Sequence, residues 1–211
     1  MNFHETMRIL EEAGAIITGS HIVYTSGLHG SAYVNKDAIY PYPKLISRLC
    51  MAISWHFMVD EIDVVIAPAI GGVILSQWVA HHLEEVTDRN VLALYAEKVD
   101  YGNGFDLRRG YDKHVNGRRI LVVEDILTTG GSARKVVEVA RGLGGEVVGV
   151  GALCNRGRVT AEKVGDVPKL ESLVNLTLDS WTAENCPLCK SGKPINTKVG
   201  KGRKFLAELG E

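Results

Sequence analysis

The fold is decided by one stretch of sequence, Ile120-Leu121-Val122-Val123-Glu124-Asp125-Ile126-Leu127-Thr128-Thr129-Gly130-Gly131-Ser132. Four apolar residues come first, two carboxylates follow, and a loop of threonines and glycines leads to a serine. An apolar run of this length is typical of a strand that is buried on both faces of a parallel sheet. Ser132 is a residue type that often caps the start of a helix. The stretch therefore predicts a strand, a turn and a helix in succession.

The same pattern extends outward in both directions along the chain. Further apolar runs of strand length occur at 64–67, 91–95, 147–153 and 173–176. Helices are expected at about 44–57, 72–82 and 132–143. Because strands that are apolar on both faces alternate with helices, the sequence predicts an α/β fold whose central parallel sheet has helices on both faces.

Segments outside this alternation are expected to form smaller elements. A hairpin is predicted at Gly19-Ser20, which would join residues 16–18 to residues 22–24. Residues 99–113 are rich in Gly, Asn, Asp and Arg and predict a long mobile loop or hairpin between two strands. The polar end of the chain is predicted to finish in a short helix at 203–209.

The composition excludes several classes of protein. Lys and Arg total 24 against 25 Asp and Glu, a formal net charge of -1, so there is no basic excess for nucleic acid or anionic membranes. No segment is apolar for long enough to span a bilayer, and the N-terminus lacks the apolar region of a signal peptide. We therefore expect no nucleic-acid partner, no membrane and a cytoplasmic location.

The two carboxylates at the end of the central strand point to a sugar. Ligands of α/β sheets bind at the carboxyl ends of the strands, where adjacent Glu124 and Asp125 could accept hydrogen bonds from two vicinal ribose hydroxyls. Residues 128–132 open a helix, where glycine backbone, hydroxyl groups and helix N–H groups can hold a phosphate. A helix cap alone would explain Ser132, but it would not explain why two acids, two threonines and two glycines occur together just before it. The pattern therefore predicts a site for a phosphoribosyl group.

This stretch resembles the motif that binds 5-phosphoribosyl-1-pyrophosphate (PRPP) in type I phosphoribosyltransferases. Within that family the chain is most similar to the bacterial orotate phosphoribosyltransferases. The similarity rests on Thr25-Ser-Gly-Leu-His-Gly-Ser-Ala-Tyr-Val-Asn-Lys36, Ala67-Pro-Ala-Ile-Gly-Gly72, Leu107-Arg-Arg-Gly110, Asn155-Arg156 and Cys186-Pro-Leu-Cys189. It implies a Rossmann-like type I phosphoribosyltransferase fold in a single domain, with a small N-terminal hood at 1–40, a PRPP-binding core at 60–180 and a C-terminal extension at 182–211.

The resemblance also implies a reaction in pyrimidine biosynthesis. Orotate would displace pyrophosphate from the anomeric carbon of PRPP and give orotidine 5′-monophosphate. Mg²⁺ would be bound mainly through PRPP, and no metal ligand is assigned to the protein. A homodimer with shared active sites is implied, because basic residues of the family reach the pyrophosphate partly across a dimer interface.

The same resemblance implies which residues form the site. PRPP would be bound by Glu124, Asp125, Thr128, Thr129, Gly130, Gly131, Ser132, Ala69, Ile70, Gly71, Gly72, Lys98, Arg108 and Arg109. The implied catalytic residues are Asp125, Glu124 and Lys98. Orotate would be bound by Tyr33, Asn35, Lys36, Thr128 and Arg156.

Structural explanations stay open for several of these residues. Gly71-Gly72 could serve the close packing of a helix on the sheet, and Tyr33 could belong to a core. Solvated surface positions would equally account for the basic residues Lys98, Arg108, Arg109 and Arg156.

Three basic residues expected from the resemblance are absent or moved. Thr25 and Gly71 stand where many orotate enzymes have lysine, and the loop from Lys98 to Gly104 contains no histidine. The base therefore stays open: a phosphoribosyltransferase for another purine or pyrimidine is an alternative, as is a non-enzymatic regulator that senses PRPP. A regulator would normally add a DNA-binding unit and a basic surface, which the charge balance does not favour.

The four cysteines do not predict a disulfide framework. Cys50 and Cys154 lie in apolar segments and are typical of core residues. Cys186-Pro-Leu-Cys189 could be a structural turn, half of a metal site or a redox pair, and we expect the turn. Zinc would need two more ligands, and neither His21 nor His81-His82 has the spacing of a ligand set.

Overall fold

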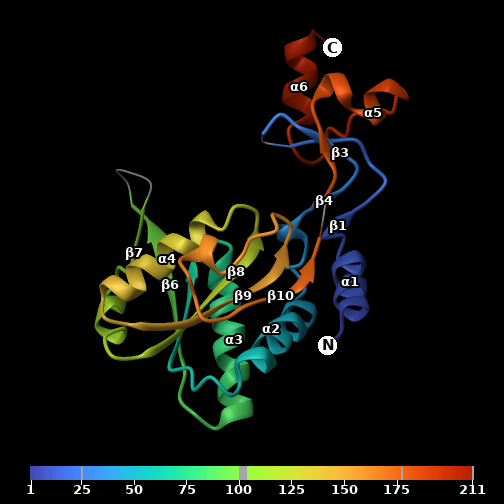
Figure 1. Cartoon of the computed structure of the whole chain (residues 1–211). Coiled ribbons are helices and arrows are strands. Elements are labelled where there is room, and N and C mark those ends of the chain that lie inside the picture. Colours follow the sequence, from blue (N-terminus) through green and yellow to red (C-terminus); the bar gives the residue numbers. More distant parts are fainter. Residues whose placement is uncertain (25, 100–103, 177, 211) are drawn as a thin grey trace. The chain divides into compact units, whose positions relative to one another are not determined.

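The computed structural model describes residues 1–24, 26–99, 104–176 and 178–210 (Figure 1). The chain divides into two compact units. Unit 1 contains Met1–Thr6 and Tyr42–Leu176, and unit 2 contains Met7–Pro41 and Thr177–Glu211. Helix α1 (Phe3–Glu12) begins in unit 1 and continues in unit 2. Unit 2 thus combines most of the N-terminal hood segment with the C-terminal extension.

Unit 1 contains a six-stranded sheet with the strand order β10-β9-β8-β5-β6-β7. Its strands are β5 (Val64–Pro68), β6 (Leu92–Lys98), β7 (Phe105–Asp106), β8 (Arg119–Leu127), β9 (Glu146–Asn155) and β10 (Leu170–Asn175). Neighbouring strands are parallel except for β7, which runs antiparallel to β6. The expected parallel sheet is therefore confirmed, and the segment predicted as a loop or hairpin contributes the antiparallel strand β7.

Helices cover both faces of this sheet (Figure 1). They are α2 (Pro43–Phe57), α3 (Gly72–Thr87) and α4 (Gly131–Gly142), with short 3-10 turns at η2 (Tyr111–His114) and η3 (Glu162–Val164). Ile66 of β5 shares a core cluster with Val136 of α4. The next residue, Ala67, points to the other face, where its Cβ would lie 2.6 Å from a Cβ added at Gly72 of α3. Because α2 packs beside α3, two helices lie on one face and α4 lies on the other.

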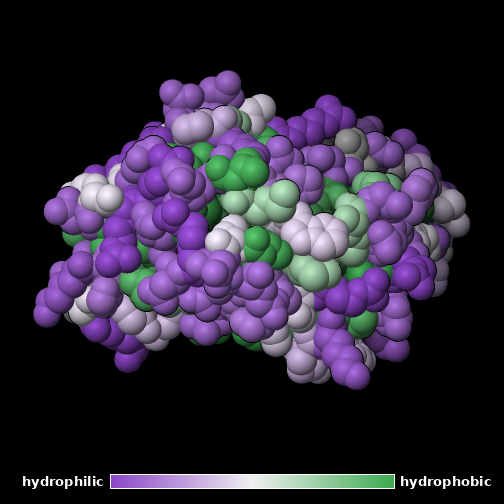
Figure 2. Space-filling model, turned by 90° about the horizontal axis from the view of Figure 1, so that it is seen from below, coloured by the Kyte–Doolittle hydropathy of each residue, from purple (hydrophilic) through white to green (hydrophobic). Residues whose placement is uncertain are grey.

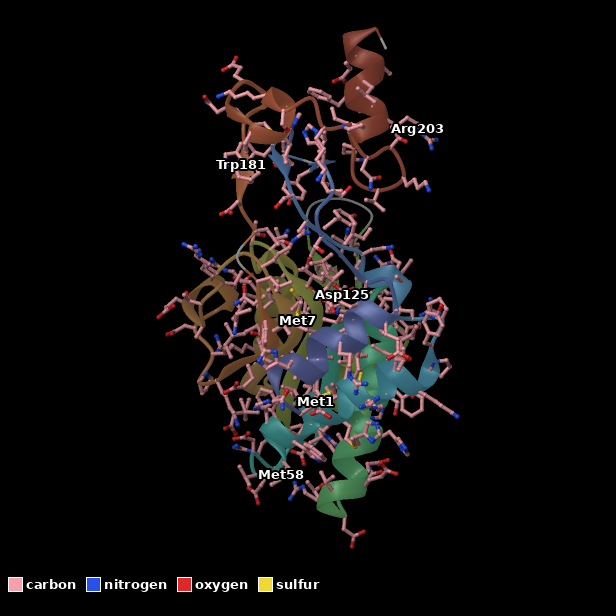
Figure 3. The ribbon with its side chains drawn as sticks, turned by 90° about the vertical axis from the view of Figure 1, so that its right-hand side faces the viewer. Met1, Met7, Met58, Asp125, Trp181 and Arg203 are labelled. Atoms are coloured by element: carbon pink, nitrogen blue, oxygen red, sulfur yellow. The ribbon has the colours of Figure 1, made fainter. Side chains whose placement is uncertain are left out.

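Unit 2 is built from short elements. They are the remainder of α1, β1 (Ile16–Ile17), β2 (Ile22–Val23), β3 (His29–Gly30), β4 (Tyr33–Val34), η1 (Lys36–Ala38), β11 (Ser180–Trp181), η4 (Ala183–Asn185), α5 (Pro187–Lys190) and α6 (Gly202–Leu209). One sheet has the order β11-β3-β2, and β1 pairs with β4 in a second. Trp181 and Arg203, labelled in Figure 3, both belong to this unit.

The hairpin predicted at Gly19-Ser20 is wrong. β1 pairs with β4 rather than with β2, and β2 pairs antiparallel with β3. The chain reverses its direction later, between β2 and β3. There the Gly27 N–H donates to the Tyr24 carbonyl at 3.0 Å, and Gly27 has φ 81°. Glycine adopts this left-handed conformation at little cost, so the turn forms there and two nested strand pairs result.

Among the helices of the ranges described above, none combines the length and hydropathy that crossing a bilayer requires. The face in Figure 2 is mostly hydrophilic, with a small hydrophobic group between the polar residues. Scattered exposed apolar side chains are usual on protein surfaces.

Candidate active site

The carboxylates predicted to meet a sugar lie at the carboxyl end of β8. Glu124 and Asp125 are 7% and 3% exposed, and Asp125 is labelled in unit 1 in Figure 3. The Ile126 N–H donates to Asp125 Oδ1 at 2.7 Å, and the Asp125 N–H donates to Glu124 Oε1 at 3.2 Å. Backbone groups thus hold both carboxylates at the edge of the sheet where α/β proteins bind ligands.

A cavity of about 150 Å³ begins at Glu124 and continues along the loop before α4. It is lined by Glu124, Ile126, Leu127, Thr128, Thr129, Gly130, Gly131 and Ser132. All five residues predicted for the phosphate loop therefore surround one space with one of the two acids. The positive end of the α4 dipole and its first N–H groups make this a favourable place for an anion.

Gly130 determines how the chain enters α4. Its φ of 78° is in the left-handed region, and a Cβ at this position would lie 2.9 Å from Cγ1 atoms of both Val159 and Val164. The left-handed backbone conformation and the lack of room for a Cβ atom both favour glycine at position 130. The Gly131 N–H donates to Thr129 Oγ1 at 3.3 Å, so the loop also closes on itself.

Arg156 lies beside this cavity because β9 pairs with β8. Leu127 and Asn155 are partners in the ladder, and the next residue, Arg156, donates its backbone N–H to the Leu127 carbonyl at 3.0 Å. Its guanidinium Nε donates to Thr128 Oγ1 at 3.0 Å. Two residues predicted to bind the same planar acid, Arg156 and Thr128, are therefore neighbours in unit 1.

Gly157 is a residue of this site that the sequence analysis missed. Its N–H donates to the Leu127 carbonyl at 3.1 Å, and a Cβ here would lie only 1.6 Å from the Thr128 carbonyl oxygen. Glycine is required because the segment after β9 touches the backbone of the phosphate loop. An Arg-Gly pair directly after an apolar strand was the available signal.

The loop Ala69–Gly72 follows β5, the strand next to β8. Its Ala69 N–H donates to the Ala96 carbonyl at 2.7 Å, its Ala69–Ile70 peptide bond is cis, and Ile70 is 88% exposed. Because β5 and β8 are parallel neighbours, this loop and the phosphate loop leave the same edge of the sheet. The close approach of Gly72 to Ala67 supports the packing explanation for this glycine.

Arg108 and Arg109, which follow β7, pair with carboxylates of β7 and β6. Arg109 Nη2 donates to Glu97 Oε1 at 3.0 Å, and this hydrogen bond raises the pKa of the Arg109 guanidinium. Arg108 Nε lies 3.8 Å from Asp106 Oδ2, and Lys98 is exposed at the end of β6. The sequence differences at Thr25 and at residues 100–103 fall outside the described residues.

The remaining residues predicted for orotate lie in unit 2. Tyr33 is in β4, Asn35 follows it, and Lys36 begins η1. The Asn35 N–H donates to the Ala15 carbonyl at 2.7 Å, which holds the start of this segment. Arg156 and Thr128 belong to unit 1.

The cysteines separate into two kinds. Burial raises the pKa of the Cys50 thiol, and it raises the pKa of Cys154 to about 12, as expected for core residues. Cys186 and Cys189 instead meet two histidines of unit 2, which the spacing of the histidines in the sequence did not indicate.

Comparison with known proteins places the chain in a family. The phosphoribosyl transferase domain matches residues 35–183. The orotate phosphoribosyltransferase of Caldanaerobacter subterraneus subsp. tengcongensis is 39% identical over 193 residues, which cover 90% of this chain and 95% of that protein. The enzyme of the same name from Thermoanaerobacter sp. is 39% identical over 207 residues, which cover 97% of this chain and 100% of that protein.

Solved structures agree with this assignment. Orotate phosphoribosyltransferase from Aeropyrum pernix has a TM-score of 0.62 and 26% identity, covering 80% of this chain and 92% of that one. The Mycobacterium tuberculosis enzyme in complex with PRPP has a TM-score of 0.62, and the match covers 82% of this chain and 95% of that one. Its sequence is 21% identical, so this likeness shows a shared fold. The chain therefore belongs to the phosphoribosyltransferase family and, within it, to the orotate phosphoribosyltransferases.

Proposed function

We propose that this chain transfers the 5-phosphoribosyl group of PRPP to orotate, releasing pyrophosphate and orotidine 5′-monophosphate. The observation that carries the proposal is the cavity that joins Glu124 to the phosphate loop, with the guanidinium of Arg156 beside it. This reaction needs three recognition elements. They are carboxylates that bind the ribose hydroxyls, a loop that binds the phosphate, and a cation that binds the negatively charged orotate. The identity with the curated orotate enzymes supports the choice of base.

PRPP recognition is divided between two loops at the same sheet edge. Glu124 and Asp125 accept hydrogen bonds from the ribose hydroxyls, and residues 128–132 bind the 5′-phosphate. Backbone groups of Ala69–Gly72 meet the pyrophosphate. The two carboxylates suit a sugar because carboxylate oxygens accept hydrogen bonds, and vicinal ribose hydroxyls supply two donors.

The residues at this edge fit Mg²⁺ carried by the substrate. Magnesium prefers oxygen ligands and keeps several waters, so it is bound mainly by substrate phosphates and few protein groups. The carboxylates of Glu124 and Asp125 supply the right donor type at the ribose end. When bound with PRPP, Mg²⁺ would supply positive charge for the leaving pyrophosphate.

Orotate is recognised by complementary charge and hydrogen bonding. The Arg156 guanidinium is planar and offers paired donors to a carboxylate, and it is already oriented by Thr128 at 3.0 Å. We also assign Tyr33, Asn35 and Lys36 to recognition of the base, as the family resemblance implies. This set of donors would distinguish an acidic pyrimidine from a neutral purine.

The chemistry relies on orientation and charge. A ring nitrogen of orotate loses its proton to solvent and bonds to the anomeric carbon as the bond from that carbon to the pyrophosphate oxygen breaks, and pyrophosphate leaves with the bonding pair. The ribose then has oxocarbenium character, which the carboxylates of Glu124 and Asp125 stabilise. Lys98, with Arg108 and Arg109, neutralises the pyrophosphate, and in a homodimer these residues reach the partner's site.

A panel of bases tests the proposal. Purified protein with Mg²⁺ and PRPP is mixed separately with orotate, uracil, hypoxanthine, guanine, xanthine and adenine, and pyrophosphate release is followed. We expect turnover with orotate alone. Arg156→Lys should raise KM for orotate about 10-fold or more and leave KM for PRPP nearly unchanged, because a point charge cannot replace a bidentate fork.

Each other outcome of the panel has a definite meaning. Turnover with a purine alone would refute the choice of base, and binding of PRPP without turnover of any base would indicate a regulator. Lys135→Arg serves as the matched control for Arg156→Lys, because Lys135 is a half-buried residue of α4 that does not line the cavity, and its change should leave both KM values unaltered.

A further inference from the structure

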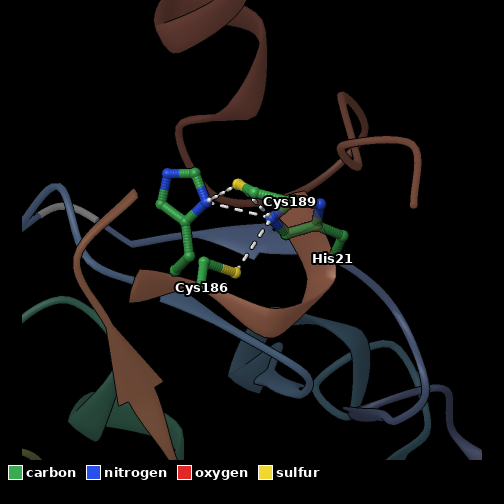
Figure 4. Close-up of side chains that lie close together, drawn as sticks. His21, Cys186 and Cys189 are labelled. Atoms are coloured by element: carbon green, nitrogen blue, oxygen red, sulfur yellow. Dashed lines mark hydrogen bonds between the residues drawn. The ribbon is translucent and has the colours of Figure 1, made fainter. Parts of the chain in front are cut away.

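Four side chains that can bind a metal converge in unit 2. They are His21, His29, Cys186 and Cys189, and their ligand atoms all lie within 4.8 Å of one another. His21 stands directly before β2 and His29 lies in β3, so antiparallel pairing brings the two imidazoles together. Cys186 precedes α5 and Cys189 lies within it. Figure 4 shows the labelled side chains of His21, Cys186 and Cys189 pointing toward one another.

Four distances between the ligand atoms lie close to the edges of a tetrahedron around one ion. His21 Nε2 lies 3.6 Å from the Sγ atoms of both Cys186 and Cys189, and Cys189 Sγ lies 3.3 Å from His29 Nδ1. The two ring nitrogens are 2.9 Å apart. With Zn–S bonds of about 2.3 Å and Zn–N bonds of about 2.0 Å, a tetrahedral site separates sulfur from nitrogen by about 3.5 Å and two nitrogens by about 3.3 Å.

Hydrogen bonding alone satisfies this cluster poorly. His21 Nδ1 lies 2.7 Å from the Lys193 carbonyl oxygen, to which it donates its proton, so Nε2 has a single lone pair directed at the other three groups. One lone pair can accept one hydrogen bond, whereas a cation satisfies all four ligand atoms. A histidine whose second nitrogen donates to a backbone carbonyl is the usual arrangement of a metal ligand.

The surroundings suit a neutral buried centre. His21, His29 and Cys186 are 1%, 0% and 0% exposed, and the ring of Phe205 from α6 lies edge-on to His29 with centroids 4.8 Å apart. Zn²⁺ with two thiolates and two neutral imidazoles has no net charge. Burial of such a centre therefore avoids the cost of isolated buried charge.

We propose that His21, His29, Cys186 and Cys189 form a structural zinc site. Four protein ligands close the coordination shell, as in structural rather than catalytic zinc sites. The site ties the β2–β3 hairpin to the Cys-Pro-Leu-Cys turn and so joins the two segments of unit 2. Such a link is needed because the helices and strands of unit 2 are short and small folding units commonly depend on a metal or disulfide. The proposal does not depend on which base the protein uses.

Metal analysis of the full chain tests the proposal. Protein purified without a histidine tag and dialysed against metal-free buffer should contain about one zinc per chain by mass spectrometry. Cys189→Ser and His21→Gln should each retain less than about a tenth of that zinc. The matched controls Cys50→Ala and His81→Gln change the same residue types away from the cluster and should retain it fully.

Experiments on the unmodified chain keep the test valid if the variants misfold. Protein refolded with Co²⁺ should show the absorption of tetrahedral cobalt with thiolate charge transfer, and chelator should lower Tm. Less than about a tenth of a zinc per chain with no such spectrum would overturn the proposal, as would bound iron in place of zinc. Two thiols missing in a titration of denatured protein would indicate a disulfide and also overturn it.

Discussion

At the scale of single residues, Asp125 is the side chain on which sugar recognition depends most. It is buried and held by the Ile126 N–H at 2.7 Å, so its orientation is set before any ligand arrives. An asparagine has nearly the same shape and can still accept that N–H. The substitution therefore isolates the charge and the second oxygen of the carboxylate.

Asp125→Asn should weaken PRPP binding. A hydrogen bond to a charged group contributes about 1.5–3 kcal/mol, so the Kd for PRPP measured by calorimetry should rise by about 10- to 150-fold. Asp112→Asn, at an exposed position in η2, is the matched control and should leave the Kd unchanged. An unaltered Kd for Asp125→Asn would mean that this carboxylate does not bind the ribose.

At the scale of elements, the contact between the end of β9 and the phosphate loop is the critical one. Arg156 and Gly157 both donate their N–H groups to the Leu127 carbonyl, and the Gly157 backbone runs directly against Thr128. Because interiors are closely packed, a methyl group inserted here has to move one of the two segments. The phosphate loop and Arg156 would move together.

Gly157→Ala should therefore damage both halves of the site. We expect a loss of about 1–3 kcal/mol in the free energy of unfolding and higher KM values for both PRPP and orotate. Gly142→Ala is the control, because a Cβ at Gly142 meets nothing within 4 Å and alanine favours a helix. A variant at Gly157 with unchanged Tm and kinetics would show that the two segments are free to separate.

At the scale of the whole molecule, basic residues on the β6–β7 hairpin indicate how sites could be shared. Arg108 and Arg109, which follow β7, are exposed and pair with Asp106 of β7 and Glu97 of β6. Lys98 is exposed at the end of β6. In the homodimer that we propose, each hairpin supplies cations to the partner's pyrophosphate.

Mixed dimers test this sharing. Asp125→Asn and Lys98→Ala chains are co-expressed with different tags, and dimers that carry both tags are purified. If Lys98 acts across the interface, one of the two sites is intact and activity should recover to about half of the unmodified level. Activity no higher than that of the single variants would mean that each site is completed within one chain.

The sheet and the phosphate cradle follow from the sequence alone, because both are encoded locally. Apolar runs such as Val64–Pro68 specify buried strands whatever their neighbours, and the five residues of the cradle are consecutive at the start of one helix. The contacts between residues that are distant in the sequence became known from the folded structure. Strand pairing places Arg156 beside Thr128 and joins β1 to β4, which is why the hairpin expected at Gly19-Ser20 does not form. The fold also places two histidines beside two cysteines from the far end of the chain. Such contacts depend on register and turn position, which residue periodicity does not specify.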